Sequence, residues 1–155
     1  MKNIVVGTDG SARAGEAVER ALELAEQCGA ELHLASAYKP LNTDAWAAAA
    51  ASAGGMVLDL RELPDPGVTV QEHLDSLAKK LGNRTGVTIH THARAGAAAD
   101  VLLDVAADVD ADLLVVGNRG MSGARRMLGS VPNTISHHAE CAVMIIPTSD
   151  STVLA

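Results

Sequence analysis

The chain has 155 residues, with 12 lysines and arginines against 19 aspartates and glutamates, and a formal net charge of −7. This length suits one domain over residues 1–155 with a single sizeable core. The acidic balance argues against binding to nucleic acid or to a membrane surface, because a polyanionic partner would be repelled. With one tryptophan, one tyrosine and no phenylalanine, the chain also lacks the aromatic platforms on which single-stranded nucleic acid stacks.

The two cysteines, Cys28 and Cys141, do not form a CxxC pair. We expect reduced, buried thiols rather than a disulfide framework. The first apolar run is about four residues long, too short for a signal peptide, and no run approaches the roughly 20 residues of a membrane span. The sequence therefore predicts a cytoplasmic protein.

The first part of the chain alternates between strand and helix patterns. Residues 4–7 form a continuous apolar run, which indicates a strand covered on both faces. Ser11 can cap a helix whose alanines, leucines and valines recur at helical spacing until Gly29. Residues 30–38 predict a second strand.

The middle of the chain is harder to interpret. Residues 40–66 predict an irregular excursion or lid, because a glycine pair together with Pro64 and Pro66 interrupts any long element. The apolar stripe over 68–82 predicts a helix. Residues 86–96 alternate between apolar and polar side chains, which predicts an edge-like strand with one wetter face.

The last third continues the alternation. We predict helices over 97–111 and 130–140, strands over 112–118 and 141–147, and a tail over 148–155. The order β-α-β-α-β-α-β-α-β implies right-handed crossovers and a parallel sheet between helices. The predicted fold is a flavodoxin/Rossmann-like doubly wound α/β fold, with five parallel strands in the order 3-2-1-4-5 and helices on both faces.

Two polar clusters follow strands that such a fold places at its centre. "GTDGS" (7–11) follows the first strand and "GNRGMSG" (117–123) follows the fourth. Ligands of open α/β sheets bind outside the carboxyl ends of the strands, where the strand order reverses. We therefore expect the two clusters to lie side by side and to form a ligand site.

The second cluster belongs to a longer glycine-rich loop. Gly117, Gly120 and Gly129 allow the backbone to approach a ligand closely, and a helix follows from Ser130. Amide groups and a helix N-terminus that converge on one point favour a phosphate. Three arginines of the loop could add charge-assisted contacts: Arg119, Arg125 and Arg126.

Other phosphate motifs do not fit the sequence. The chain has no Gly-Lys pair and therefore no Walker loop. The glycines after the first strand have the wrong spacing for a dinucleotide fingerprint, and Asp9 stands alone where a phosphate-accepting receiver domain would have clustered acids. No catalytic residue is predicted, since Ser11 and Ser130 lack a base nearby in the sequence.

Two histidine pairs raise the question of a metal. His90 and His92 share one strand face, whereas His137 and His138 are adjacent on a helix and point about 100° apart. Neither pair has a cysteine or carboxylate at ligand spacing in the sequence. We therefore expect surface histidines and no metal site.

Four segments together resemble the nucleotide-binding branch of the universal stress protein family: "IVVGTDGS", "AELHLASAY", "ADLLVVGNRG" and "GSVPNTISHHAECAVMIIP". The nucleotide-binding pattern of that family is Gly, two residues, Gly, nine residues, then Gly-Ser or Gly-Thr. Here eight residues separate Gly120 from Gly129-Ser130. One turn of the backbone in this loop must therefore differ from that of the family's nucleotide binders.

The resemblance implies roles for individual residues. Asp9 would contact ribose or a metal-bound phosphate, with Thr8 beside it; capping of the first helix stays open as a different role for Asp9. Ala37 would offer backbone groups to adenine, and Val116 and Gly117 would flank the base and sugar. Four residues would hold phosphates: Gly120, Gly129, Ser130 and Val131.

The resemblance also implies a ligand and a partner. The ligand would be ATP or another adenine nucleotide such as AMP or cyclic AMP, with Mg²⁺ accompanying ATP. The partner would be a second copy, joined through the apolar strand 141–147. We expect a stress-response sensor that binds its ligand without efficient catalysis. A slow ATP hydrolase or phosphotransferase, and a nucleotide-free dimeric scaffold, stay open as alternatives.

Overall fold

The computed structural model describes residues 1–42, 44, 52, 64–118 and 130–148. Its strands are β1 (Asn3–Gly7), β2 (Glu31–Tyr38), β3 (Ile89–Ala95), β4 (Leu113–Gly117) and β5 (Ala142–Ile146). Its helices are α1 (Ala12–Cys28), α3 (Pro66–Gly82), α4 (Ala98–Asp108) and α5 (Ser130–His138).

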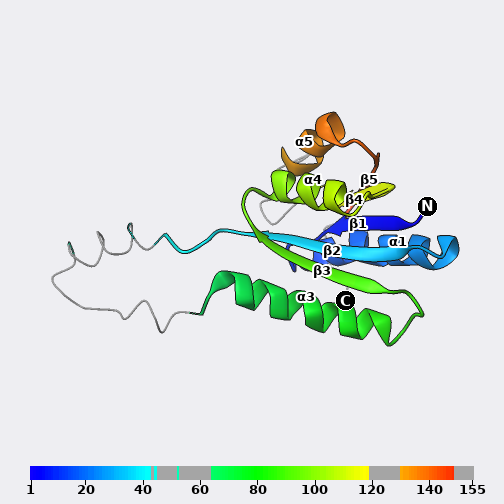
Figure 1. Ribbon diagram of the computed structural model, residues 1–155, viewed down its shortest axis with the longest axis horizontal. Helices are drawn as coiled ribbons and strands as arrows, with labels where there is room; N and C mark the ends of the chain where they lie inside the picture. Colours follow the sequence, from blue (N-terminus) through cyan, green and yellow to red (C-terminus); the bar gives the residue numbers. More distant parts are fainter. Residues whose placement is uncertain (43, 45–51, 53–63, 119–129, 149–155) are drawn as a thin grey trace, which may run out of the picture.

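The five strands form one sheet in the order β3-β2-β1-β4-β5, and every neighbouring pair is parallel (Figure 1). The predicted fold class and strand order are therefore confirmed. β2 and β3 extend the sheet on one side of β1, and β4 and β5 extend it on the other. The strand order thus reverses between β1 and β4, which is where such sheets bind ligands.

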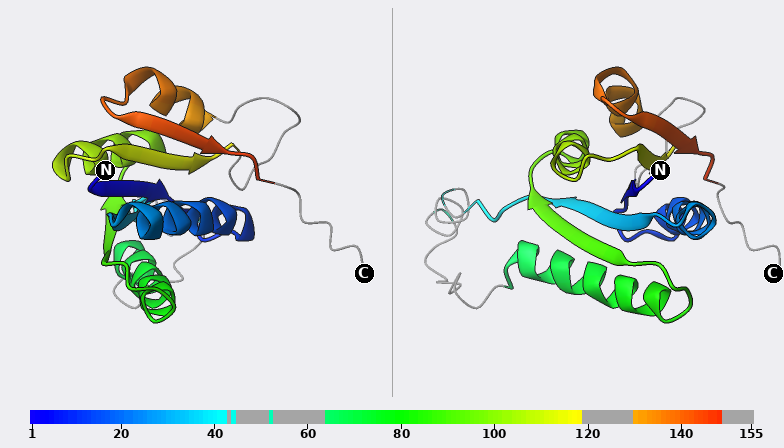
Figure 2. Two further views of the ribbon diagram at one scale, coloured as in Figure 1. Left: turned by 90° about the vertical axis from the view of Figure 1, so that its right-hand side faces the viewer. Right: turned by 45° about the vertical axis from the view of Figure 1, so that its right-hand side comes forward.

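Helices cover both faces of the sheet (Figure 2). Alternate side chains of the central strands pack against the helices on opposite faces. Ile4 and Val6 of β1 belong to a core shared with α1 and α3, whereas Val5 belongs to a core shared with α4 and α5. This arrangement explains why the strand sequences are apolar throughout. Both cores are almost purely aliphatic, as the composition predicts.

Local sequence explains how α1 begins and ends. The Ser11 hydroxyl accepts a hydrogen bond from the backbone N–H of Ala14 at 3.2 Å, which is the expected N-cap. The helix ends at Gly29, whose φ of 63° lies in the left-handed region that glycine adopts without strain.

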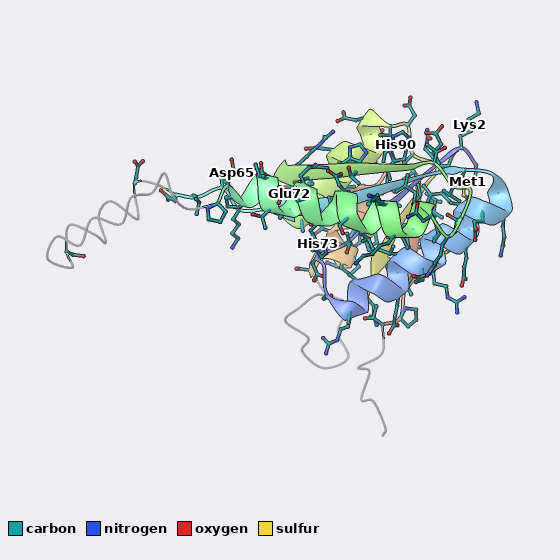
Figure 3. All side chains as sticks on the ribbon, turned by 90° about the horizontal axis from the view of Figure 1, so that it is seen from below. Met1, Lys2, Asp65, Glu72, His73 and His90 are labelled. Atoms are coloured by element: carbon teal, nitrogen blue, oxygen red, sulfur yellow. The ribbon has the colours of Figure 1, made fainter. Side chains whose placement is uncertain are left out.

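The helix α3 begins two residues earlier than predicted. Asp65 caps it by accepting a hydrogen bond from the N–H of Gly67 at 2.8 Å, and Pro66 occupies its first turn. Proline suits that position because its missing N–H would have no partner inside the helix. Our interpretation of Pro66 as part of an irregular segment was therefore wrong. Figure 3 shows α3 beside α1 on this face of the sheet.

Several further expectations can be compared with the described residues. β3 lies at an edge of the sheet and β5 at the other, as predicted. Cys28 is exposed at the end of α1 and Cys141 is half-buried, so the prediction of two buried thiols was wrong for Cys28. No helix among the described residues is long and apolar enough to cross a membrane. Most of the predicted excursion over 40–66, and all but the first residue of the tail, lie outside the described residues.

Candidate functional site

The loop after β1 is held in place by a hydrogen bond to β2 and by the side chains of Thr8 and Asp9. Thr8 is 8% exposed; its N–H donates to the carbonyl of Ala35 on β2 at 2.9 Å, and its hydroxyl accepts from the N–H of Gly10 at 3.2 Å. Asp9 is exposed, and its Oδ1 accepts from the N–H of Ser11 at 3.0 Å. Asp9 therefore shapes the turn before α1, while Ser11 is the residue that caps the helix.

The end of β4 lies beside this loop. Val6 of β1 pairs with Val115 of β4, and the same register continued by two residues brings Thr8 level with Gly117. The loop 7–11 and the first two residues of the segment 117–123 therefore lie together at the carboxyl ends of β1 and β4, as predicted, while residues 119–123 lie outside the described part of the chain. Gly117 is half-buried and ends its strand, whereas the side chain of Val116 is buried in the core.

Asn118, which follows β4, connects this edge of the sheet to the end of β5. Its backbone N–H donates to the carbonyl of Ile146 at 2.8 Å. Its side-chain Oδ1 accepts two hydrogen bonds at 2.9 Å, from the N–H and from the hydroxyl of Thr148. Thr148 is 5% exposed, so these bonds satisfy buried polar groups at the point where the glycine-rich loop begins. Sequence reasoning missed this pair, because the two residues are 30 positions apart and no local pattern connects them.

The remaining predicted residues are distributed around the same edge. Ala37 is half-buried near the end of β2, where it pairs with Arg94 of β3. Ser130 is exposed and begins α5, and Val131 packs against the core shared with α4. Residues 119–129 lie outside the described part of the chain, and with them five residues predicted to contact the ligand: Arg119, Gly120, Arg125, Arg126 and Gly129.

One neighbour of the β1 loop was missed by sequence reasoning. Gly10 has a φ of 76°, and a Cβ added to it would lie 3.3 Å from Nε2 of His73. His73 belongs to α3, which follows β2 in the chain (Figure 3). A helical histidine on an otherwise solvent-facing stripe gives no sign in the sequence that it lies beside a loop more than 60 residues away.

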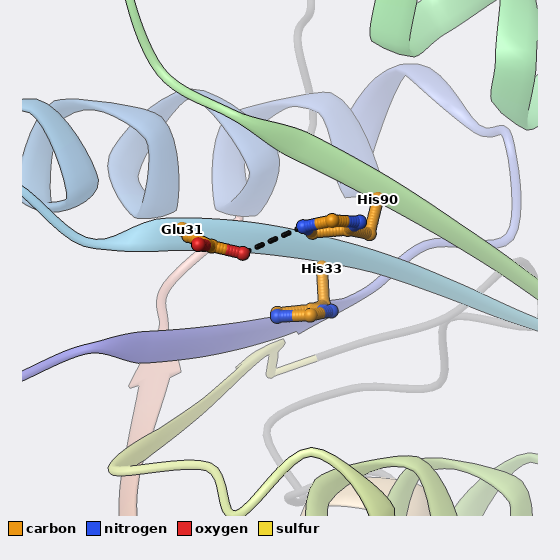
Figure 4. Close-up of side chains that lie close together, drawn as sticks. All are labelled: Glu31, His33 and His90. Carbon is orange, nitrogen blue, oxygen red and sulfur yellow. Dashed lines mark hydrogen bonds and ion pairs between the residues drawn. The ribbon is translucent and has the colours of Figure 1, made fainter.

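A second polar cluster lies elsewhere, on β2 and β3. Nε2 of His90 lies 2.6 Å from Oε2 of Glu31, and the His90 ring stacks on His33 with 4.7 Å between centroids (Figure 4). Nδ1 of His33 lies 3.1 Å from Nε2 of His92. The cluster is assembled by the pairing of His33 with His90 across the two strands. No carboxylate lies at ligand spacing from His90 in the sequence, but the pairing of β2 with β3 places Glu31 beside it.

The strand order and the helices on both faces define a doubly wound α/β protein, and its polar edge at the β1–β4 reversal lies where proteins of this class bind ligands. The sequence model of the universal stress protein family matches residues 1–147. The chain therefore belongs to the universal stress protein family, which confirms the resemblance.

Individual relatives span nearly the same length. Universal stress protein Rv1636 of Mycobacterium tuberculosis is 37% identical over 149 residues, which cover 96% of this chain and 97% of the relative. A crystal structure of a universal stress protein in complex with cAMP superposes with a TM-score of 0.68 at 31% identity, covering 96% of this chain and 98% of that one. The universal stress protein UspA of Lactobacillus plantarum has a TM-score of 0.71 at 21% identity, over 94% of this chain and 97% of its own, a likeness of fold.

Proposed function

We propose that this protein binds an adenine nucleotide, with ATP as the preferred ligand, and acts as a stress-response regulator rather than as an efficient enzyme. The observation that carries the proposal is the reversal of strand order between β1 and β4. It brings the Asp9 loop and the start of the glycine-rich loop to one edge of the sheet, where α/β proteins bind nucleotides.

The chemistry of the described residues suits the sugar and phosphates. The exposed carboxylate of Asp9 has acceptor capacity beyond its bond to Ser11, so it can receive ribose hydroxyls or approach a phosphate-bound Mg²⁺. The hydroxyl of Ser130 and the first amides of α5 would contact phosphates. Gly120, Gly129 and Val131 would complete the phosphate site.

The base would lie on the other side of the β1 loop. Ala37, near the end of β2, would offer backbone groups to adenine, while Val116 and Gly117 would flank the base and sugar. The buried side chain of Val116 is occupied with the core, so its contribution would come from the backbone. The relative solved in complex with cAMP, at 31% identity, supports an adenine nucleotide as the class of ligand.

One consideration favours ATP within this class. The glycine-rich loop carries three arginines in the sequence, Arg119, Arg125 and Arg126, which is more positive charge than a single cyclic phosphodiester requires. Thr8 contributes through the loop geometry, because its hydroxyl and N–H are both used to hold the turn that presents Asp9.

The test begins with the protein as purified. It is denatured, and released nucleotide is identified by absorbance and mass; nucleotide-free protein is then titrated with ATP, AMP and cAMP by calorimetry. Asp9→Asn keeps an oxygen for the Ser11 N–H but loses the charge, so we expect about a tenfold weaker affinity for ATP. Asp104→Asn, an exposed aspartate on α4, is the matched control. Absence of nucleotide and of binding to all three ligands would refute the proposal.

The principal alternative is slow ATP hydrolysis or phosphotransfer. Such chemistry needs a metal-organising acid and a group that orients the nucleophile, and Asp9 supplies at most the first. Metal-dependent turnover by the wild type that is lost in Asp9→Ala would favour the enzyme over the regulator. Binding of ATP without turnover would favour the regulator.

We also propose that the protein forms a homodimer through β5. This strand lies at the edge of the sheet, and its apolar residues Val143, Met144, Ile145 and Ile146 are only half-buried in a single chain. Uncovered apolar edges favour pairing with a second strand, and a two-fold axis would pair β5 with its own copy in antiparallel orientation. Sedimentation equilibrium at micromolar concentration should give twice the chain mass, and a monomer would contradict this proposal.

A further inference from the structure

The cluster on β2 and β3 contains a buried histidine, His33, one of whose ring nitrogens has no partner in the part of the chain that the structure describes. His33 is 6% exposed, and its Nε2 is a buried polar atom without a hydrogen-bond partner among the described residues. Such an atom is costly to bury, since it has lost its contact with water and gained nothing in return. The unpartnered ring nitrogen therefore indicates that a further group binds to it.

The surroundings of this nitrogen identify the ligand. The atoms that Glu31, His33 and His90 offer as donors all lie within 4.8 Å of one another. Figure 4 shows that each of the two stacked rings directs one nitrogen toward Glu31. Two imidazoles and one carboxylate, brought together by neighbouring strands, form the donor set that divalent transition metals prefer.

From this geometry we propose that Glu31, His33 and His90 bind a divalent transition metal ion of the Zn²⁺ class. Metal-bound donors lie about 3.3 Å apart when each bond is about 2.05 Å and the centre is tetrahedral. His90 and Glu31 are 43% and 53% exposed at their side chains, so they can move to this spacing from the solvent side. A water molecule would fill the fourth position.

His92 is the positioning residue of this site. When His33 Nε2 binds a metal, its Nδ1 carries the proton and donates to Nε2 of His92, 3.1 Å away. A second hydrogen bond of this kind fixes the tautomer and the orientation of metal-bound imidazoles. The geometry of the His33–His92 pair is thus already the one that the metal would require.

The charge state of His33 agrees with this role. Burial, followed by the charges of His90 and His92, lowers the pKa of His33 to about 4, against a smaller opposing effect of Glu31. The ring is therefore neutral near pH 7 and offers a lone pair that a proton does not occupy.

The test uses the untagged full chain, freed of nucleotide and stripped of metal with a chelator. Calorimetric titration with Zn²⁺, with a chromophoric chelator as competitor, should show one tight equivalent per chain. Co²⁺ should give the intense visible absorption of a tetrahedral centre. His90→Ala and Glu31→Gln should each weaken the affinity about a hundredfold or more, since each removes a ligand from an exposed position and leaves the core unchanged.

Two matched substitutions serve as controls. His137→Ala and Glu26→Gln change an exposed histidine and an exposed glutamate outside the cluster, and should leave the Zn²⁺ affinity unchanged. His92→Ala should weaken binding by about 10- to 100-fold while the Co²⁺ spectrum keeps its tetrahedral form. The proposal is overturned if no stoichiometric site is found, or if His90→Ala binds Zn²⁺ as tightly as the wild type.

Discussion

Acidification should destabilise the metal-free protein through His33. The ring is 6% exposed, and burial together with the charges of His90 and His92 lowers its pKa from 6.5 to about 4. Glu31, which raises the pKa, offsets only part of this effect. The folded state therefore resists protonation of His33, whereas the unfolded chain accepts the proton at the ordinary pKa.

The sign and the size of the effect follow from these two values. Because the pKa is lower in the folded protein, the contribution of His33 to stability is fully present above about pH 6.5 and is lost as the pH falls toward 4. Proton linkage with these pKa values gives a loss of about 2 kcal/mol between pH 7.5 and pH 5. This is a large fraction of the roughly 5–15 kcal/mol that stabilises a typical domain.

Urea denaturation in the presence of a chelator, at about pH 7.5 and about pH 5, measures the loss. The wild type should lose about 2 kcal/mol more than His33→Gln, whose side chain does not titrate in this range. His137→Gln, a substitution at an exposed histidine of α5, should behave like the wild type. If His33→Gln loses as much stability as the wild type, the reasoning from burial is refuted.

Two further substitutions test contacts that shape the proposed nucleotide site. Ser11→Ala removes the hydroxyl that caps α1 and should lower the free energy of unfolding by about 1 kcal/mol. The control Ser76→Ala, at an exposed position of α3, should leave the free energy of unfolding unchanged. Equal losses in the two variants would contradict the capping role of Ser11. Asn118→Ala leaves the buried N–H and hydroxyl of Thr148 without their acceptor and should cost about 1–3 kcal/mol in urea denaturation, so an unchanged midpoint would show that water replaces the side chain.

The sheet could be predicted because its strands are buried on both faces. The continuous apolar runs of β1 and β4 separate clearly from the helical patterns between them, and the alternation of the two fixes a parallel, doubly wound arrangement. The convergence of Asp9 and Gly117 could be predicted for the same reason, since the switch-point rule needs only the strand order. Element boundaries were less accurate: Pro66 begins α3 although prolines more often interrupt a helix.

The histidine cluster could not be predicted from spacing. Glu31 and His90 are 59 positions apart, and their contact depends on the register between β2 and β3, which no local pattern specifies. A shift of one residue in that register would turn His90 to the opposite face from His33. Sequence reasoning considered His90 with His92 in their own strand, and therefore found no carboxylate.

The two sites lie toward opposite ends of the sheet, and β2 contributes to both. Ala37 lies four positions after His33 in β2, a distance of about 13 Å at 3.3 Å per residue. The residues between them are buried in a well-packed strand, so an ion at His33 can change the shape of the nucleotide site only by displacing β2 as a unit, which such packing opposes. Its charge acts on the nucleotide only across the same distance, where water and salt screen it. We therefore expect the wild type and His90→Ala to bind ATP with the same affinity. The titration is done without Mg²⁺ and at a Zn²⁺ concentration too low for ATP itself to chelate the ion. A difference in ATP affinity between the two proteins would show that the sites are coupled. Because such coupling is reciprocal, bound nucleotide would then also change the affinity for Zn²⁺, and β2 would have two arrangements instead of one.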